Sequence, residues 1–168
     1  FTKDGFFRTG DIGIFDDRGR MSITGRIKDI IVTAGGKNIS PQNIENTLKG
    51  SKFIEQVAVI GDKRKYLSAL VIPAFEEVKK WATKQGLRFN SNDEMIANDA
   101  VHALIAKEIE MYMMDFARVE QIRKFRLLNA EWTQATDELT PTLKVKRRVI
   151  EKKYAPEIES MYPVDSGD

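Results

Sequence analysis

The order of strand-like and helix-like segments limits the fold of this chain more than any other property of its sequence. Two apolar runs, QVAVIG (56–61) and YLSALVIP (66–73), read as strands, and the charged segment 62–65 between them fits a tight connection. Helix-like segments flank this pair, and another strand-like run, IRKFRLL, spans 122–128. The sequence therefore predicts an α/β fold, close to the α+β class, in which a small mixed sheet of about three strands packs with helices.

Capping residues indicate where the helices begin and end. Ser-Pro at the start of 40–50 predicts a helix with Ser as N-cap and Pro in its first position, closed by the glycine at its end. A second helix is expected over 75–86, also ended by glycine. The Ser-x-x-Glu capping box at 91–94 predicts the start of a long helix. Its buried stripe would be Val101, Ile105, Ile109, Met113 and Phe116.

The N-terminal part reads as a separate unit. Residues 6–38 form short strand-like runs punctuated by turns, and Asp-Arg-Gly at 17–19 is a β-hairpin signal. The boundary with the rest of the chain is placed near Arg26 to Asp29. The chain opens at Phe1 inside a strand-like pattern without an initiator Met, which suggests an excised fragment or a processed product.

Composition excludes several classes of protein. The 27 basic and 25 acidic residues give a net charge of +2, so the whole chain has no polycationic character that would attract nucleic acid. No segment approaches the ~20 consecutive apolar residues that span a bilayer. Zero cysteines exclude a disulfide framework and a cysteine-ligated metal, and they fit a reducing compartment. A chain of 168 residues can hold one core, or one domain plus a piece of another.

Three short stretches near the N-terminus each allow two interpretations. Asp11 follows a glycine at a strand start, where a carboxylate either accepts hydrogen bonds from a cis-diol such as a ribose or caps local amides. Arg26 either binds a phosphate or ribose oxygen or is an edge-strand charge, and Lys28 and Asp29 fit a solvated edge equally well. The stretch AGG (34–36) either lets a ligand approach the backbone or is a turn.

A basic segment lies near the C-terminus. In LTPTLKVKRR (139–148), a Pro/Thr-rich stretch presents a lysine just before a helix expected from about Val145. Six of the ten residues from Lys144 to Lys153 are Lys or Arg, although helix N-termini favour acids. This conflict suggests an anion site, and the alternative is a solvated basic helix face.

Other chemistry-bearing residues are assigned structural roles. His102 is the one histidine and lies beside the apolar stripe, so packing is favoured over metal binding, and no metal site is predicted. No Ser-His-Asp set can be assembled. Trp81 and Trp132 are expected to serve in core or helix packing.

Three motifs, taken together, resemble one family. FFRTGD, then GRIKDIIVTAGGKNISPQNIE, then LTPTLKVKRR, in this order and spacing, are similar to the closing motifs of the adenylate-forming acyl-CoA ligases. The segment with QIRKFRLL, WT and ELTPTLKVKRR most resembles the long-chain fatty acid branch. The resemblance implies residues 1–27 as the tail of a large N-terminal nucleotide-binding domain and 28–168 as the small mobile C-terminal domain. The large domain, with its phosphate loop and acyl pocket, would precede Phe1.

The resemblance assigns nucleotide-binding roles near the domain boundary. Asp11 matches the aspartate that holds the ribose hydroxyls of ATP, and Arg26 matches the arginine that contacts the nucleotide. Lys28 falls on the hinge position, whose backbone torsions absorb the rotation between the two states. Whether Lys28 also acts through its side chain is left open.

The final motif supplies the expected catalytic lysine. Lys144 matches the family lysine that lies between the carboxylate and the α-phosphate and stabilises negative charge as pyrophosphate leaves. Relatives usually read Ser-Gly-Lys here, and this sequence reads Thr-Leu-Lys. Lys146 is the rival, but Lys-Val-Lys-Arg-Arg aligns with the family pattern Lys-x-x-Arg-Arg and favours Lys144.

The resemblance also assigns residues to coenzyme A. The loop that lines the pantetheine tunnel after the domain rotation corresponds to Thr33, Ala34, Gly35 and Gly36. Basic partners for the phosphates of coenzyme A would be Lys37, Lys124 and Arg126.

The intact enzyme would activate a long-chain fatty acid with ATP to an acyl-adenylate and then form the coenzyme A thioester. Mg²⁺ would be bound mainly through ATP and the missing domain, and the fragment alone is expected to be inactive. The resemblance implies a cytoplasmic enzyme that can also contact a membrane surface, because its substrate is a lipid. The alternatives are a ligase for an aryl, medium-chain or amino acid, and a binding module whose basic helix contacts RNA, DNA or an anionic membrane.

Overall fold

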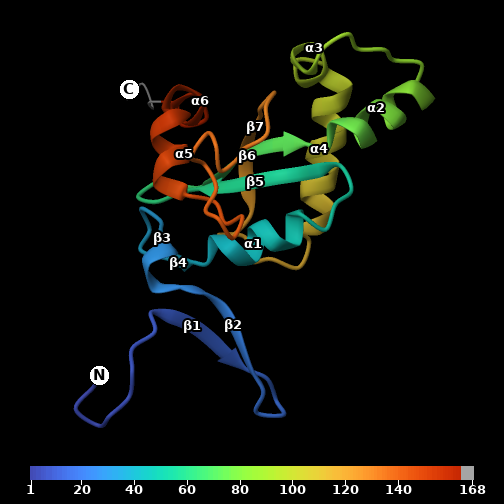
Figure 1. The fold of residues 1–168 in the computed structure, drawn as a ribbon. Helices are drawn as coiled ribbons and strands as arrows, with labels where there is room; N and C mark the ends of the chain where they lie inside the picture. Colours follow the sequence, from blue (N-terminus) through green and yellow to red (C-terminus); the bar gives the residue numbers. More distant parts are fainter. Residues whose placement is uncertain (164–168) are drawn as a thin grey trace, which may run out of the picture.

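The N-terminus forms the predicted β-hairpin. The computed structural model describes residues 1–163, and in it β1 (Asp11–Phe15) pairs antiparallel with β2 (Met21–Arg26). Gly19 has φ +73° in the connecting turn, and the Asp16 carboxylate accepts hydrogen bonds from the amides of Arg18 and Arg20, each at 2.9 Å. Figure 1 shows the hairpin projecting away from the helices and the larger sheet.

The chain between the hairpin and the larger sheet changes direction twice. A short 3₁₀ turn, η1 (Ile27–Asp29), interrupts the strand-like runs that the sequence suggested over residues 6–38. It leads into a second small sheet of β3 (Ile31–Val32) and β4 (Asn38–Ile39). The charges at 28 and 29 therefore lie in a turn and not along a strand.

The main sheet has the order β5-β6-β7. Strand β5 (Ile54–Ile60) pairs antiparallel with β6 (Leu67–Pro73), and β7 (Ile122–Leu127) adds parallel to β6. All residues of β6 are buried, as befits a central strand. The predicted three-stranded mixed sheet and the α/β class are confirmed.

The helices α1 (Pro41–Leu48) and α2 (Phe75–Lys84) begin close to the predicted positions. α1 has Ser40 at its N-cap and packs on β5, and α2 is followed by Gly86 at φ +74°. The glycine after α1 has a different role from a left-handed cap, because a Cβ on Gly50 would lie 3.0 Å from the ring of Tyr112. Close approach of two elements explains that glycine.

The predicted long helix is in fact two helices. The capping box at 91–94 opens only α3 (Asn92–Ile96), where the Glu94 amide donates to Ser91 Oγ at 3.2 Å. The long helix α4 (Asp99–Tyr112) has its own cap, because Asn98 accepts from the two amides that follow Asp99. The predicted stripe of buried residues is correct for its first four members, which are all buried. Met113 and half-buried Phe116, however, follow the end of the helix.

The basic C-terminal helix starts two residues later than expected, as α5 (Arg147–Lys153), and is followed by α6 (Ala155–Ser160). One continuous core joins the sheet, α1, α4, α5 and α6. Trp132, 1% exposed, lies in this core as predicted.

Candidate functional site

The hairpin brings the two expected nucleotide-binding residues together. Asp11 and Arg26 face each other across β1 and β2, and Arg26 Nε donates to Asp11 Oδ1 at 3.1 Å. The Asp11 amide donates to Thr9 Oγ1 at 3.1 Å, which holds the backbone at the strand start. Both side chains are accessible to solvent, so a carboxylate acceptor and a guanidinium donor are available at one place.

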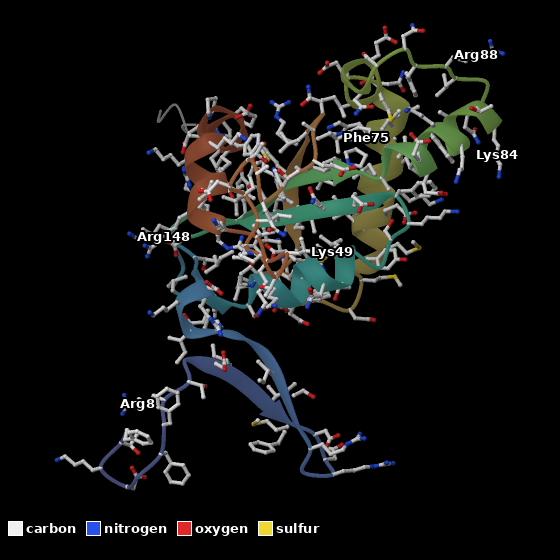
Figure 2. The ribbon with its side chains drawn as sticks, in the orientation of Figure 1. Arg8, Lys49, Phe75, Lys84, Arg88 and Arg148 are labelled. Carbon is white, nitrogen blue, oxygen red and sulfur yellow. The ribbon has the colours of Figure 1, made fainter. Side chains whose placement is uncertain are left out.

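The segment at the proposed hinge lines a cleft with the final motif. Lys28 and Asp29 lie on one side of a cleft of about 550 Å³, and residues 145–148 and Glu151 lie on the other. Burial raises the pKa of Glu151, and the nearby Asp62 carboxylate raises it further against the opposing charge of Arg147. Figure 2 shows Arg148 pointing outward from α5 on the side of the molecule where β3 lies.

The loop predicted to line the pantetheine tunnel is a tight turn in this structure. Thr33 and Lys37 close it through two hydrogen bonds, from Thr33 N to Lys37 O at 3.0 Å and from Lys37 N to Thr33 Oγ1 at 3.2 Å. Gly36 has φ +73°, and Ala34 N donates to Arg64 O at 2.9 Å. Thr33 is buried while the rest of the loop, including Gly35, is exposed. This geometry therefore agrees with both interpretations of the sequence, a turn and a loop whose backbone a ligand can approach.

The two candidate lysines of the final motif have different surroundings. Lys146 Nζ donates to the carboxylate of Asp137. Lys144 is exposed in a turn between Leu139 and Val145, which form an antiparallel bridge, and no carboxylate within residues 1–163 lies at ion-pair distance from it. Lys144 is thus the lysine whose ammonium is available to a ligand.

The basic helix α5 is less free to bind anions than its sequence suggested. Arg147 Nη2 lies 2.6 Å from the buried Glu45 carboxylate, and Lys153 pairs with Glu138, which is 1% exposed. Burial alone would raise the pKa of Glu138, but hydrogen bonds, chiefly from Lys153, outweigh burial and lower it. Glu45 thus neutralises the cation at the first position of α5 and resolves part of the conflict with the helix dipole, whereas Lys153 lies in the last turn, where the dipole favours a cation. Arg148 stays exposed.

A basic hollow of about 320 Å³ lies along β7. Lys124 and Arg126 line it with Arg123 and His102, whose ring stacks on Phe125 with centroids 4.4 Å apart. Arg126 Nε donates to Ser160 Oγ at 3.1 Å. Loop 33–37 contributes no residue to this hollow, so the three basic residues predicted for coenzyme A phosphates are not gathered in one place.

Sequence reasoning missed the carboxylates that hold the final motif in place. Glu45 and Glu138 each neutralise one of the cations of α5. The only sequence feature that set Glu45 apart was its position next to the apolar residue Ile44 in α1. Glu138 stands in a loop-like segment and gave no signal.

Within residues 1–163, no helix combines the length and the apolar character that a bilayer span requires. That part of the chain also holds no group of three or more His, Asp or Glu side chains placed to bind a metal ion.

The chain is similar to known long-chain fatty acid ligases. It is 39% identical over 160 residues to the long-chain-fatty-acid–CoA ligase FadD15 of Mycobacterium tuberculosis, a match that covers 95% of this chain and 27% of that protein. It is 31% identical to the Drosophila melanogaster long-chain-fatty-acid–CoA ligase heimdall over 198 residues, which cover 95% of this chain and 29% of that one. The chain thus spans less than a third of each relative.

Solved structures share the fold. The adenylation domain of a carboxylate reductase from Mycobacterium chelonae superposes with a TM-score of 0.78 at 24% identity, covering 96% of this chain and 24% of that one. The family described as the AMP-binding enzyme C-terminal domain matches residues 28–165. This match covers most of the chain and agrees with the resemblance that the three motifs carried. The chain therefore belongs to the AMP-binding enzyme C-terminal domain family.

Proposed function

We propose that this chain is the C-terminal part of a long-chain fatty acid–CoA ligase, in which Lys144 acts in adenylate formation. The observation that carries the proposal is the contrast between exposed Lys144 and ion-paired Lys146 at the final motif. The substrate class rests on the 39% identity to a long-chain-fatty-acid–CoA ligase.

The first half-reaction joins the fatty acid to AMP. A carboxylate oxygen of the acid attacks the α-phosphorus of ATP, and the bond to the pyrophosphate oxygen breaks. Lys144 would lie beside the reacting oxygens and stabilise their negative charge, which a point charge on a flexible stem suits. Asp11 would accept hydrogen bonds from the ribose hydroxyls, and Arg26 would contact the nucleotide. Mg²⁺ would arrive with ATP and be held mainly by the preceding domain.

The second half-reaction forms the thioester. The thiol sulfur of coenzyme A, having lost its proton, attacks the acyl carbonyl, and AMP leaves. We assign the turn 33–36 to the pantetheine arm, because its exposed small residues let a ligand approach the backbone. The hollow along β7, with Lys124 and Arg126, suits the phosphates of coenzyme A. Lys37 would act separately, at the turn itself.

We assign residues 1–27 to the large N-terminal domain and residues 28–168 to the mobile domain, with Lys28 at the hinge. Large apolar side chains of the N-terminal segment support this assignment, because they are exposed as they would be on a surface that another domain covers. They are Phe6, Phe7, Ile14, Phe15, Met21 and Ile23.

Activity of the full-length protein tests the proposal. With ATP, Mg²⁺ and palmitate it should release pyrophosphate, and with added coenzyme A it should form palmitoyl-CoA. Benzoate, octanoate and amino acids serve as competing acids, and a preference for one of these would contradict the long-chain assignment. The 168-residue chain alone should release no pyrophosphate, because most of the ATP site and the acyl site lie outside it.

A further inference from the structure

The backbone around Lys144 forms a closed turn. Thr140 N donates to Lys144 O at 2.8 Å, and Leu143 N donates to Thr140 O at 2.8 Å. At the two ends of the turn, Leu139 and Val145 form an antiparallel bridge. Pro141 follows Thr140, at the position of a β-turn where its fixed φ is favoured. We name residues 139–145 the lysine turn.

The Thr140 side chain adds a further hold on the same residue. Its Oγ1 accepts a hydrogen bond from Lys144 N at 3.0 Å and lies 3.1 Å from Thr142 Oγ1. Thr140 therefore fixes both the amide and the carbonyl of Lys144, while the Lys144 side chain stays in solvent. One residue thus sets the direction in which the lysine leaves the backbone.

Leu143 adopts a conformation that leucine rarely takes. Its φ is +58°, in the left-handed region that glycine and asparagine enter at lower cost. Its side chain is 65% exposed, so little burial compensates for this conformation. The turn is instead held in this form by the hydrogen bonds that Thr140 makes with the amide of Leu143 and with the amide and carbonyl of Lys144.

We propose that Thr140 is the positioning residue of Lys144, and that the lysine turn presents the ammonium from a preformed backbone. The proposal deepens the function proposed above and rests on Lys144 acting in adenylation. A preformed turn reduces the ordering that the lysine must undergo when the reacting groups meet. The catalytic group is Lys144, and Thr140 acts through it.

Variants of the full-length protein test the role of Thr140. Thr140→Val removes the hydroxyl and keeps the shape, and we expect kcat for pyrophosphate release to fall roughly tenfold, with KM for ATP within about twofold. Thr140→Ser keeps the hydroxyl and should restore the rate. Thr83→Val is the matched control, since the Thr83 hydroxyl on α2 donates to the carbonyl of Lys79 in the same helix. Thioester formation from supplied palmitoyl-adenylate should be unchanged in all three variants.

A second pair of variants tests the turn if Thr140→Val does not fold. Leu143→Asn favours the left-handed conformation, whereas Leu143→Val opposes it because the side chain is branched at Cβ. We expect Asn to keep adenylation and Val to lower it without affecting the second half-reaction. Equal adenylation rates in the two Leu143 variants would overturn the proposal.

The outcomes separate this proposal from the function on which it rests. If the unmodified protein releases no pyrophosphate with any carboxylate, the proposed function fails. If it is active and Thr140→Val matches it, only the positioning role fails. An equal loss in both half-reactions, together with a lower melting temperature, would show a purely structural role for Thr140 and would also overturn the proposal.

Discussion

Arg147 and Glu45 form an ion pair that closes the free edge of strand β5. Arg147 Nη2 donates to Glu45 Oε1 at 2.6 Å, and the same oxygen accepts the amide of Val59 at 2.8 Å. Arg147 Nη1 donates to the Val59 carbonyl. The two side chains thus satisfy both backbone groups of Val59, as a neighbouring strand would, and they tie the start of α5 to the sheet.

Removing Glu45 should strongly destabilise the chain. Glu45→Ala leaves a largely buried guanidinium and a buried amide without their partner, for which we expect a loss of about 3 kcal/mol in the free energy of unfolding. Urea denaturation of the 168-residue chain measures this loss. Glu76→Ala is the matched control, because the Glu76 carboxylate is exposed and its pair with Lys79 should contribute less than about 0.5 kcal/mol. Similar losses in the two variants would contradict the edge-closing role.

The two lysines of the final motif should differ in kinetics. In the full-length protein, Lys144→Ala should lower the rate of adenylation by roughly 10²–10³-fold, the scale seen when one charge-stabilising group is removed. Thioester formation from supplied acyl-adenylate should persist. Lys146→Ala breaks only the pair with Asp137 and should leave adenylation within about threefold of the unmodified protein. The reverse pattern would transfer the catalytic role to Lys146.

Asp11 should govern nucleotide affinity. Asp11→Ala removes the acceptor proposed for the ribose hydroxyls, so we expect KM for ATP to rise about tenfold or more, because hydrogen bonds to a charged group contribute about 1.5–3 kcal/mol. Steady-state kinetics with varied ATP measure the change. Asp17→Ala, in the exposed hairpin turn, controls for general effects of removing a hairpin carboxylate. An unchanged KM in Asp11→Ala would leave Asp11 as a partner of Arg26 alone.

His102 should make stability depend on pH. Burial, and then the charge of Arg126, lower the pKa of His102 below its usual 6.5. At a pH between the His102 pKa of the folded state and that of the unfolded state, the unfolded chain binds more protons. The stability that neutral His102 contributes is therefore complete above pH 6.5 and is lost as the pH falls toward the pKa of the folded state. His102→Gln should flatten the unfolding free energy between pH 7.5 and about 5.5. The chain has one histidine, so its NMR titration reads the site directly, and a midpoint above 6.5 would contradict the prediction.

Lys28 should act through its backbone. Lys28→Ala keeps the torsional freedom of the hinge and should leave both half-reactions of the full-length protein within about twofold of the original rates, whereas Lys28→Pro fixes φ near −65° and should slow one of them. Separate assays of adenylation and thioester formation show which state is trapped. Equal rates in the two variants would remove Lys28 from the hinge, and a large loss in Lys28→Ala would assign a role to its side chain.

Local patterns were enough to predict the elements that form the sheet. Strand-like runs flank the charged segment 62–65, and the structure has β5 and β6 there. The turn at Gly19 and the end of α2 at Gly86 followed from residues that adopt positive φ. The proximity of Asp11 and Arg26 was expected from the resemblance as a shared ligand, and the strand register brings it about.

Local sequence patterns could not predict contacts between residues that are far apart in the chain. Glu45 and Arg147 meet at the edge of β5 although about a hundred positions separate them, and neither residue has a neighbour in sequence that indicates the other. The capping box at 91–94 was real but opened a short helix, because Asn98 provides a competing cap for α4. The left-handed Leu143 was also unpredictable, since its conformation is imposed by hydrogen bonds to Thr140 and not by leucine itself.

The connection between the parallel strands has a consequence for how the chain acquires its structure. β5 and β6 are adjacent in sequence and can pair as a hairpin, but β7 must return to β6 across residues 74–121. Closing so long a loop costs entropy before any contact offsets it, so formation of the β6–β7 ladder should limit the rate of folding. The surface formed by Lys124 and Arg126 would then exist only at the end of that slow step.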